Sequence, residues 1–286
     1  MIYSQAMSRL DAWMTERDRI LVMGIVNVTP DSFHDGGRFL DPDAAIARAL
    51  QMEAEGADVL DVGGESTRPG SRSVTAQEEI DRIAPVIEGI RRRSDLPISI
   101  DTTKAAVARE ALGAGAAIIN DVGALRFDEA MAGTVADAGA CVVLMHMLGS
   151  PETMQVDPSY GDVVGEIDAF FAERIDAAID AGIERGRILI DPGIGFGKRL
   201  ADNLSILRGL ERFASHGVPI AVGASRKSFL GAILDLPSDE RLEGTIVANA
   251  VAILHGADII RVHDVKEGVR TAAVAARLRS DDATNR

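Results

Sequence analysis

Eight short apolar runs, each followed by a longer stretch with helical spacing, constrain the fold of this 286-residue chain most strongly. The runs are almost entirely apolar, which is typical of strands buried on both faces of a parallel sheet. They cover residues 20–26, 59–62, 98–100, 117–119, 141–145, 188–190, 220–222 and 259–262. The amphipathic segments that follow them cover residues 44–55, 76–93, 104–112, 128–138, 160–181, 202–213, 243–254 and 266–278.

Eight strand–helix alternations in a chain of this length predict an α/β fold with a single (β/α)₈ barrel. An open, doubly wound sheet is the alternative, but it calls for a glycine-rich loop after the first strand. The first run leads instead into Asn27-Val28-Thr29-Pro30. Because there is no linker or shift in composition, we expect one barrel over residues 20–279. A variable extension (1–19) precedes it, and a flexible tail (280–286) follows.

Composition and charge argue against several classes of protein. A net charge of -14 disfavours a broad surface for nucleic acid or anionic membranes. No apolar run approaches the roughly 18–20 residues of a membrane span, and the first 20 residues lack the apolar core of a signal peptide. The single cysteine, Cys141, cannot form an internal disulfide and is expected to be a buried strand residue. We therefore expect a cytoplasmic protein that acts on small molecules, without nucleic-acid or membrane partners.

Polar side chains stand at the carboxyl end of every predicted strand, where barrels of this kind carry their active sites. In chain order they are Asn27, Asp61, Asp101, Asn120 with Asp121, His146, Asp191, Ser225-Arg226-Lys227, and Arg261 with His263. Any one of them alone is more often a cap, a turn residue or a surface charge. His146, as a lone histidine, is more often a structural residue. Eight polar strand ends at one rim nevertheless predict a common binding site.

The charges at this rim are segregated. Carboxylates and amides dominate the ends of the first six strands, whereas Arg226, Lys227 and Arg261 come from the last two, and Arg68 lies in the loop after the second. Guanidinium and ammonium groups suit phosphoryl oxygens, and the loops after strands seven and eight often hold a phosphate in this fold. The alternative is that Lys227 and Arg261 only form ion pairs with nearby acids.

Asp101, Asn120 and Asp191 suit a different target. Carboxylates accept hydrogen bonds and an amide both donates and accepts, so together they can read the edge of a heterocycle that carries N–H and carbonyl groups. The alternative is that Asn120-Asp121 and Asp191-Pro192 only shape turns. The five histidines and one cysteine lack the spacing of zinc ligands, and no Ser/His/Asp arrangement is recognisable.

The polar strand ends lie inside long runs that resemble the dihydropteroate synthase family. These runs cover residues 23–33, 35–37, 56–70, 99–104, 119–122, 144–147, 191–198, 223–229 and 261–265. The resemblance extends from about residue 20 to residue 268 in the family's order. The departures are small: His34 replaces a small polar residue or Tyr, and the first 19 residues form a variable extension.

This resemblance implies roles for individual residues. A pterin-binding set would comprise Asp101, Asn120, Asp191 and Lys227, with Met145 and Phe196 near the ring faces. A diphosphate site would comprise Asn27, Arg68, Arg261 and His263, with Asn27 also helping to hold Mg²⁺. The p-aminobenzoate side would comprise Phe33, Thr67, Pro69 and Ser228. The groups implied in catalysis are Asp35, Lys227, Arg261 and His263.

The reaction that the resemblance implies joins (7,8-dihydropterin-6-yl)methyl diphosphate to p-aminobenzoate and releases diphosphate, in folate biosynthesis. Sulfonamides would compete with p-aminobenzoate, and the family suggests a homodimer. Two alternatives stay open. One is a pterin-binding methyltransferase that serves a corrinoid, which has no need of the runs at residues 67–69 and 225–228. The other is a non-catalytic pterin-binding paralogue, in which the first two loops should be eroded.

Overall fold

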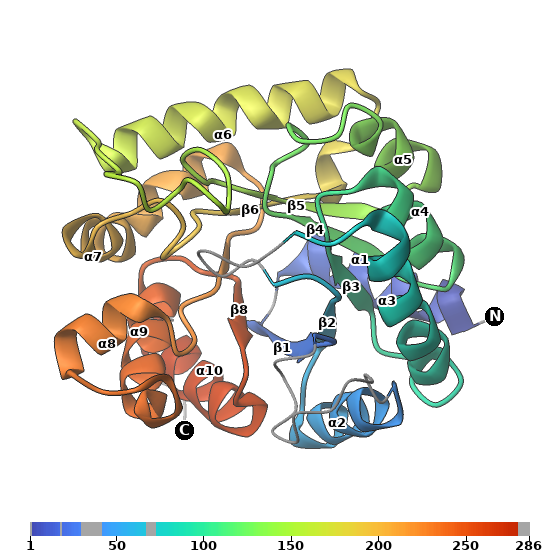
Figure 1. Ribbon diagram of the computed structural model, residues 1–286. Coiled ribbons are helices and arrows are strands. Elements are labelled where there is room, and N and C mark those ends of the chain that lie inside the picture. The colour runs from blue at the N-terminus through green and yellow to red at the C-terminus, as the bar shows by residue number, and fades with distance from the viewer. Residues whose placement is uncertain (1, 18, 30–41, 67–72, 280–286) are drawn as a thin grey trace.

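A computed structural model describes residues 2–17, 19–29, 42–66 and 73–279 of the chain, which form a closed barrel of parallel strands surrounded by helices (Figure 1). The strands are β1 (Leu21–Asn27), β2 (Val59–Gly63), β3 (Ile98–Asp101), β4 (Ile118–Asp121), β5 (Cys141–Met145), β6 (Ile188–Asp191), β7 (Ala221–Val222) and β8 (Ile259–Val262). Their order in the sheet is β6-β5-β4-β3-β2-β1-β8-β7, and a parallel bridge between Ile190 and Ile220 closes the ring. The predicted (β/α)₈ barrel is therefore confirmed.

One helix follows each strand. In chain order they are α2 (Pro42–Glu55), α3 (Ala76–Arg91), α4 (Ala105–Gly113), α5 (Met131–Ala138), α6 (Val163–Asp180), α7 (Leu200–Arg208), α9 (Leu242–Leu254) and α10 (Val265–Arg279). The short helix α8 (Ser228–Leu234) also lies between β7 and α9, and 3₁₀ turns occur at η2 (Arg185–Arg187), η3 (Leu210–His216) and η4 (Ser238–Glu240). The sequence did not predict α8, because its seven residues are too short for a helical period to be recognised.

Three predicted helix boundaries were wrong for local reasons. The helix expected over 202–213 ends at Arg208 and continues as the 3₁₀ turn η3, because Gly209 is a poor helix former at the junction. Helix α6 begins after Asp162, whose carboxylate caps it by accepting a hydrogen bond from the Gly165 amide at 3.1 Å. Helix α5 begins at Met131, because Asp128 instead accepts from the amides of Ala105 and Ala130.

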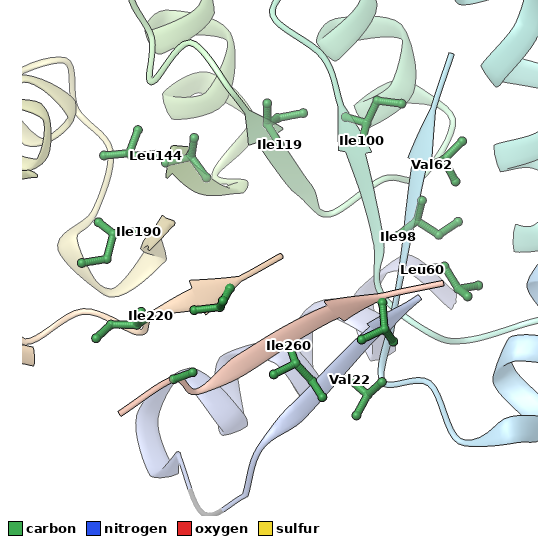
Figure 2. Packing of buried hydrophobic residues seen from close by; sticks show 14 of the residues in the cluster. Val22, Leu60, Val62, Ile98, Ile100, Ile119, Leu144, Ile190, Ile220 and Ile260 are labelled. Atoms are coloured by element: carbon green, nitrogen blue, oxygen red, sulfur yellow. The ribbon is translucent and has the colours of Figure 1, made fainter. Parts of the chain in front are cut away.

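Alternation along the strands divides the core into two parts. One set of strand residues faces the helices and forms the larger hydrophobic cluster, in which Figure 2 labels Val22, Leu60, Val62, Ile98, Ile100, Ile119, Leu144, Ile190, Ile220 and Ile260. The alternate residues form a second cluster inside the barrel, which includes Leu21, Met23, Val59, Ile118, Cys141, Val143, Leu189, Ala221 and Ile259. Strands buried on both faces explain why the eight runs are so uniformly apolar.

Cys141 belongs to the inner cluster and is buried, as expected. Burial raises the pKa of its thiol to about 11. A thiol with such a raised pKa stays protonated near neutral pH and is a poor nucleophile.

Helix α1 (Ile2–Glu16) closes the amino-terminal end of the barrel and lies behind the strands in Figure 1. Its residues Leu10, Trp13 and Met14 are buried and belong to the cluster inside the barrel. The Trp13 indole also donates a hydrogen bond to the Arg19 carbonyl at 2.9 Å. The segment treated as an extension in the sequence thus contributes to the core. No helix among the described residues is long and apolar enough to cross a membrane.

We expect Trp13→Ala to lower the free energy of unfolding by about 3 kcal/mol, because it removes a large buried side chain from a packed end of the barrel. Urea unfolding followed by circular dichroism measures this change. The exposed Glu16→Ala should change stability by no more than about 0.5 kcal/mol. Equal stability of the two variants would contradict the conclusion that α1 packs into the core at the amino-terminal end of the barrel.

Candidate active site

A polar layer lies inside the barrel directly above the apolar cluster. It arises because side chains two residues apart on a strand point to the same side of the sheet. Stepping two residues along β2, β4, β6 and β8 leads from Val59 to Asp61, Ile118 to Asn120, Leu189 to Asp191, and Ile259 to Arg261. In β3 the same step leads from Ser99 to Asp101, which pairs in register with Asn120. The carboxyl end of the barrel therefore collects these five polar side chains from five strands.

Arg261 is the centre of this layer. Its Nε donates to Asp61 Oδ2 at 2.6 Å, and its Nη2 donates to Asp101 Oδ2 at 2.8 Å. Asn120 Nδ2 donates to the same Asp61 oxygen at 3.2 Å. One guanidinium thus orients two buried carboxylates that would otherwise repel each other.

The Asp61–Asp101–Arg261 cluster keeps unsatisfied hydrogen-bonding capacity. Among the described residues, Asp61 Oδ1 and Asp101 Oδ1 are buried and have no hydrogen-bond partner. Burial raises the pKa of Asp101 to about 7, against the lowering effect of Arg261, and the neighbouring Asp61 raises it further. A buried acceptor without a partner is costly, so the arrangement suits a ligand that brings N–H donors to this layer.

Lys227 and Asp191 form the opposite side of the mouth. Asp191 Oδ1 accepts a hydrogen bond from the Gly193 amide at 2.7 Å, and burial raises the pKa of its carboxyl while Lys227 opposes this change. Lys227 Nζ donates to the Ile194 carbonyl and lies 4.6 Å from the centre of the Phe196 ring. Burial lowers the pKa of Lys227 to about 8, although the Asp191 charge acts against it.

Apolar side chains complete the wall between these polar groups. Val122, Met145, Met147 and Met154 form a small buried cluster, and Phe196 packs against it. A flat heterocycle needs such faces as well as polar edges, because most of its buried surface is apolar. Thioether side chains adapt to ring surfaces particularly well.

The loops after β7 and β8 are bound to each other. Ser225 Oγ lies 2.9 Å from His263 Nδ1 and also accepts from the His263 amide. Arg226 forms a bidentate ion pair with Asp264, at 2.8 and 2.7 Å. Arg226 is therefore engaged by a carboxylate, and we do not assign it to anion binding. Ser228, the first residue of α8, is exposed beside Lys227.

Two of the polar residues at the strand ends, Asp121 and His146, do not belong to the mouth. The prediction of one common site was therefore wrong for His146 after β5, whereas Asn120 still represents β4 there. Asp121 follows the alternate position on β4, and its two oxygens accept from the amides of Gly123 and Leu125, both at 2.7 Å. His146 contacts the ring of Phe170 on α6, and its Nδ1 lies 3.0 Å from Lys198 Nζ. Asp121 shapes a turn and His146 is structural, as the alternative interpretations stated.

Several residues named from the sequence lie outside the described residues: Phe33, Asp35, Thr67, Arg68 and Pro69. Asn27 is the last residue of β1 and is half-buried at the mouth of the barrel. Within the described ranges, no group of three or more His, Cys, Asp or Glu side chains is placed to hold a metal ion. Any metal here would take few ligands from these side chains.

Sequence reasoning missed four residues that help to form the site. Asp61 was noted at the rim but not assigned a role, although two-residue alternation from Val59 could have placed it inside the barrel. Val122, Met147 and Met154 lie beyond the strand ends, where no periodicity indicates which side chains face the mouth.

A pocket opens beside Asp101, between the loops that follow β2, β3, β4 and β5. Its lining includes Thr102, Lys104, Val122, Phe127 and Pro151. The polar layer is therefore accessible from the carboxyl end of the barrel, the same end at which the cations of the last two strands lie.

Comparison with known proteins assigns this barrel and its mouth to a class. A family profile for pterin binding enzymes matches residues 23–263, which is most of the chain. The dihydropteroate synthase of Synechocystis sp. is 46% identical over 261 residues, which cover 91% of this chain and 90% of that protein.

Comparison with solved structures gives the same assignment. Dihydropteroate synthase from Yersinia pestis, in complex with a sulfonamide drug, superposes with a TM-score of 0.88 and 44% identity, covering 92% of this chain and 95% of that one. The enzyme from Xanthomonas albilineans with 4-aminobenzoic acid gives a TM-score of 0.87 and 47% identity, covering 92% and 94%. The chain therefore belongs to the dihydropteroate synthase family.

We predict that the carboxyl carbon of Asp101, followed by ¹³C NMR, titrates with a pKa of about 7. Arg261→Met should raise this pKa further, because it removes the cation that stabilises the ionised form. Arg19→Met, which removes an exposed cation paired with Asp58, is the control and should leave the titration unchanged. An Asp101 pKa near 4 in the wild-type protein would contradict this description of the site.

Proposed function

We propose that this chain catalyses the condensation of (7,8-dihydropterin-6-yl)methyl diphosphate with p-aminobenzoate to give 7,8-dihydropteroate and diphosphate. The observation that carries the proposal is the polar layer at the barrel mouth, in which Asp61, Asp101 and Asp191 face Arg261 and Lys227. Membership of the chain in the dihydropteroate synthase family supports the same reaction. The Xanthomonas enzyme binds 4-aminobenzoic acid and the Yersinia enzyme binds a sulfonamide drug, which suggests the same site in this chain.

The reaction exchanges one bond for another at a single carbon. The C–O bond between the pterin methylene and the diphosphate breaks, and the electron pair leaves with the diphosphate oxygen. The amine nitrogen of p-aminobenzoate forms the new C–N bond and releases a proton to solvent. No covalent intermediate with the protein is needed, so the chain contributes orientation and electrostatic stabilisation.

Pterin recognition is assigned to the polar layer. The pterin edge carries an exocyclic amine, a ring N–H and a carbonyl, which complement the carboxylates of Asp101 and Asp191 and the amide of Asn120. Lys227 is the donor for a ring nitrogen or the carbonyl. Met145 and Phe196 provide the apolar contacts to the ring faces.

The charged side chains at the mouth of the barrel favour departure of the diphosphate anion. Three carboxylates face two cations near the reacting carbon, so positive charge that develops on the methylene is stabilised. Asp35 is a further candidate for this stabilisation. Arg261, His263 and Arg68 are the candidates for contact with the diphosphate. Nε of Arg261 donates to Asp61 and Nη2 to Asp101, so we assign the anion contact to Nη1, which makes neither of these bonds.

The amide oxygen of Asn27 is the proposed protein ligand for a magnesium ion, which would act together with the diphosphate. Mg²⁺ commonly keeps several waters and takes one or two oxygens from the protein when phosphate oxygens supply the rest. Asn27 offers its amide oxygen at the carboxyl end of β1, close to the strand that carries Arg261. Bound there, the ion would neutralise charge on the leaving group.

Release of diphosphate tests the reaction directly. We expect release only when both the pterin diphosphate and p-aminobenzoate are present, and Lys227→Ala or Asp101→Asn should lower kcat/KM by about 100-fold or more. Lys266→Ala, which changes an exposed lysine, is the control and should keep wild-type activity. A corrinoid methyltransferase or a non-catalytic paralogue would release no diphosphate, and wild-type activity in either site variant would remove that residue from the site.

Binding of Mn²⁺ in the presence of inorganic diphosphate, followed by electron paramagnetic resonance, tests the metal assignment. Asn27→Ala should weaken Mn²⁺ binding severalfold because it removes the amide ligand. Diphosphate binding in the absence of metal should weaken less than Mn²⁺ binding, because Arg261 and His263 remain in the variant. Unchanged Mn²⁺ affinity would exclude Asn27 as a ligand.

The homodimer suggested by the family has a candidate surface on the last two helices. Val247 and Leu254 on α9 and Val274 and Leu278 on α10 are exposed, and the two helices lie side by side (Figure 1). Exposed apolar side chains on neighbouring helices are typical of association surfaces. We assign the subunit contact of the proposed homodimer to this surface. The cytoplasmic location of the protein stays a prediction.

Sedimentation velocity tests the assembly. The wild-type chain should sediment as a dimer at micromolar concentration, and the double variant Val247→Glu, Val274→Glu should sediment as a monomer, because two buried charges per subunit would oppose association. Val156→Glu, at an exposed valine in the loop after β5, is the matched control and should stay dimeric. A monomeric wild-type protein would refute the dimer.

A further inference from the structure

Lys198, in the loop after β6, is a buried lysine that the proposed reaction does not use. Only 4% of its surface is exposed, and among the described residues no carboxylate lies within ion-pair distance of its ammonium. Its Nζ lies 3.0 Å from His146 Nδ1, 3.2 Å from the His146 carbonyl and 2.9 Å from the Phe196 carbonyl. An ammonium has three N–H donors, so these three acceptors satisfy all of them.

These hydrogen bonds join the loop after β5 to the loop after β6. The two loops also touch through their backbones at Gly193 and Gly197, which both have positive φ angles. A Cβ atom on Gly193 would lie 2.0 Å from the His146 carbonyl oxygen, and one on Gly197 would lie 2.9 Å from Leu148 Cβ. This contact tolerates no side chain, and Lys198 lies within it as the donor to both loops.

Groups assigned to the pterin pocket lie directly beside this junction. The His146 amide donates to the Asp191 carbonyl at 2.9 Å, and Met145 pairs with Asp191 in the strand register. Phe196, whose carbonyl accepts from Lys198, lies under the Lys227 ammonium. A shift of this contact between the two loops would therefore move the apolar wall at Phe196, the carboxylate of Asp191 and the ammonium of Lys227 together.

We propose that Lys198 is a positioning residue for pterin binding, which fixes Phe196 and Met145 at the walls of the pocket by joining the loops after β5 and β6. This inference rests on the proposed function. Lys198 is too deeply buried behind its three acceptors to act as a ligand itself.

The same geometry assigns the proton of His146. In its ammonium form Lys198 offers only donors, so below pH 7 His146 Nδ1 is assigned as the acceptor and the ring proton as lying on Nε2. Burial lowers the pKa of His146 to about 2, and the charges of Lys198 and Arg126 contribute. Burial also lowers the pKa of Lys198 to about 7, while the charges of Asp191 and Asp202 oppose this change and Lys227 adds to it.

The variant Lys198→Met tests the positioning role, because it keeps an unbranched apolar chain and removes the three donors. Affinity for 6-hydroxymethylpterin, measured by calorimetric titration, should fall about tenfold, and KM for the pterin diphosphate should rise by a similar factor. The KM for p-aminobenzoate should change less than twofold. Unchanged pterin affinity in a folded variant would overturn the proposal.

Two further measurements separate this proposal from loss of fold and from failure of the proposed function. Lys266→Met, at an exposed lysine, should leave pterin affinity unchanged, and thermal unfolding reports whether each variant is folded. The ¹⁵N NMR shifts of His146 require no ligand. At pH 6, where Lys198 is mostly an ammonium, they should indicate the Nε2–H form in the wild type and lose the Nδ1 hydrogen-bond shift in Lys198→Met. An Nδ1–H form in the wild type would overturn the assignment of Lys198 even if the chain binds pterin.

Discussion

The pairing of Arg261 with Asp61 and Asp101 is the interaction on which the mouth of the barrel depends. Three charged side chains from β8, β2 and β3 meet inside a barrel whose lower layer is apolar except for Ser99. Burying two carboxylates without a cation would cost several kcal/mol, and burying the guanidinium alone would cost as much. Together they form a stable platform, yet within the described part of the chain each carboxylate retains an oxygen without a partner. The three side chains can therefore keep this arrangement without substrate and still favour a ligand that supplies hydrogen-bond donors.

Much of this organisation could be predicted from the sequence, because the strands obey a simple rule. Each of the eight apolar runs became a strand, and the two-residue period fixes which strand residues face inward. That period places Asp101, Asn120, Asp191 and Arg261 in one layer. The same rule explains the errors at Asp121 and His146. Asp121 is one residue beyond the inward position on β4, and His146 is one residue beyond Met145 on β5, so both turn away from the mouth.

The remaining features depend on loop geometry, for which the sequence has no comparable period. Nothing in the spacing of Lys198 indicates that it folds back onto His146, and the ion pair of Arg226 with Asp264 joins two loops that are 38 residues apart. Helix α8 is too short for its amphipathic pattern to be recognised. Helix α1 was undervalued for a different reason: its buried residues are few, and their partners are distributed over strands far along the chain.

The position of α1 has a consequence for engineering. The helix packs against the amino-terminal ends of the strands, whereas the polar layer occupies the opposite pole, with the apolar interior between them. A domain or affinity tag joined ahead of residue 2 would extend from the pole farthest from the substrates. Such fusions leave substrate entry at the carboxyl end of the barrel unobstructed, provided that Leu10, Trp13 and Met14 stay buried at its amino-terminal end.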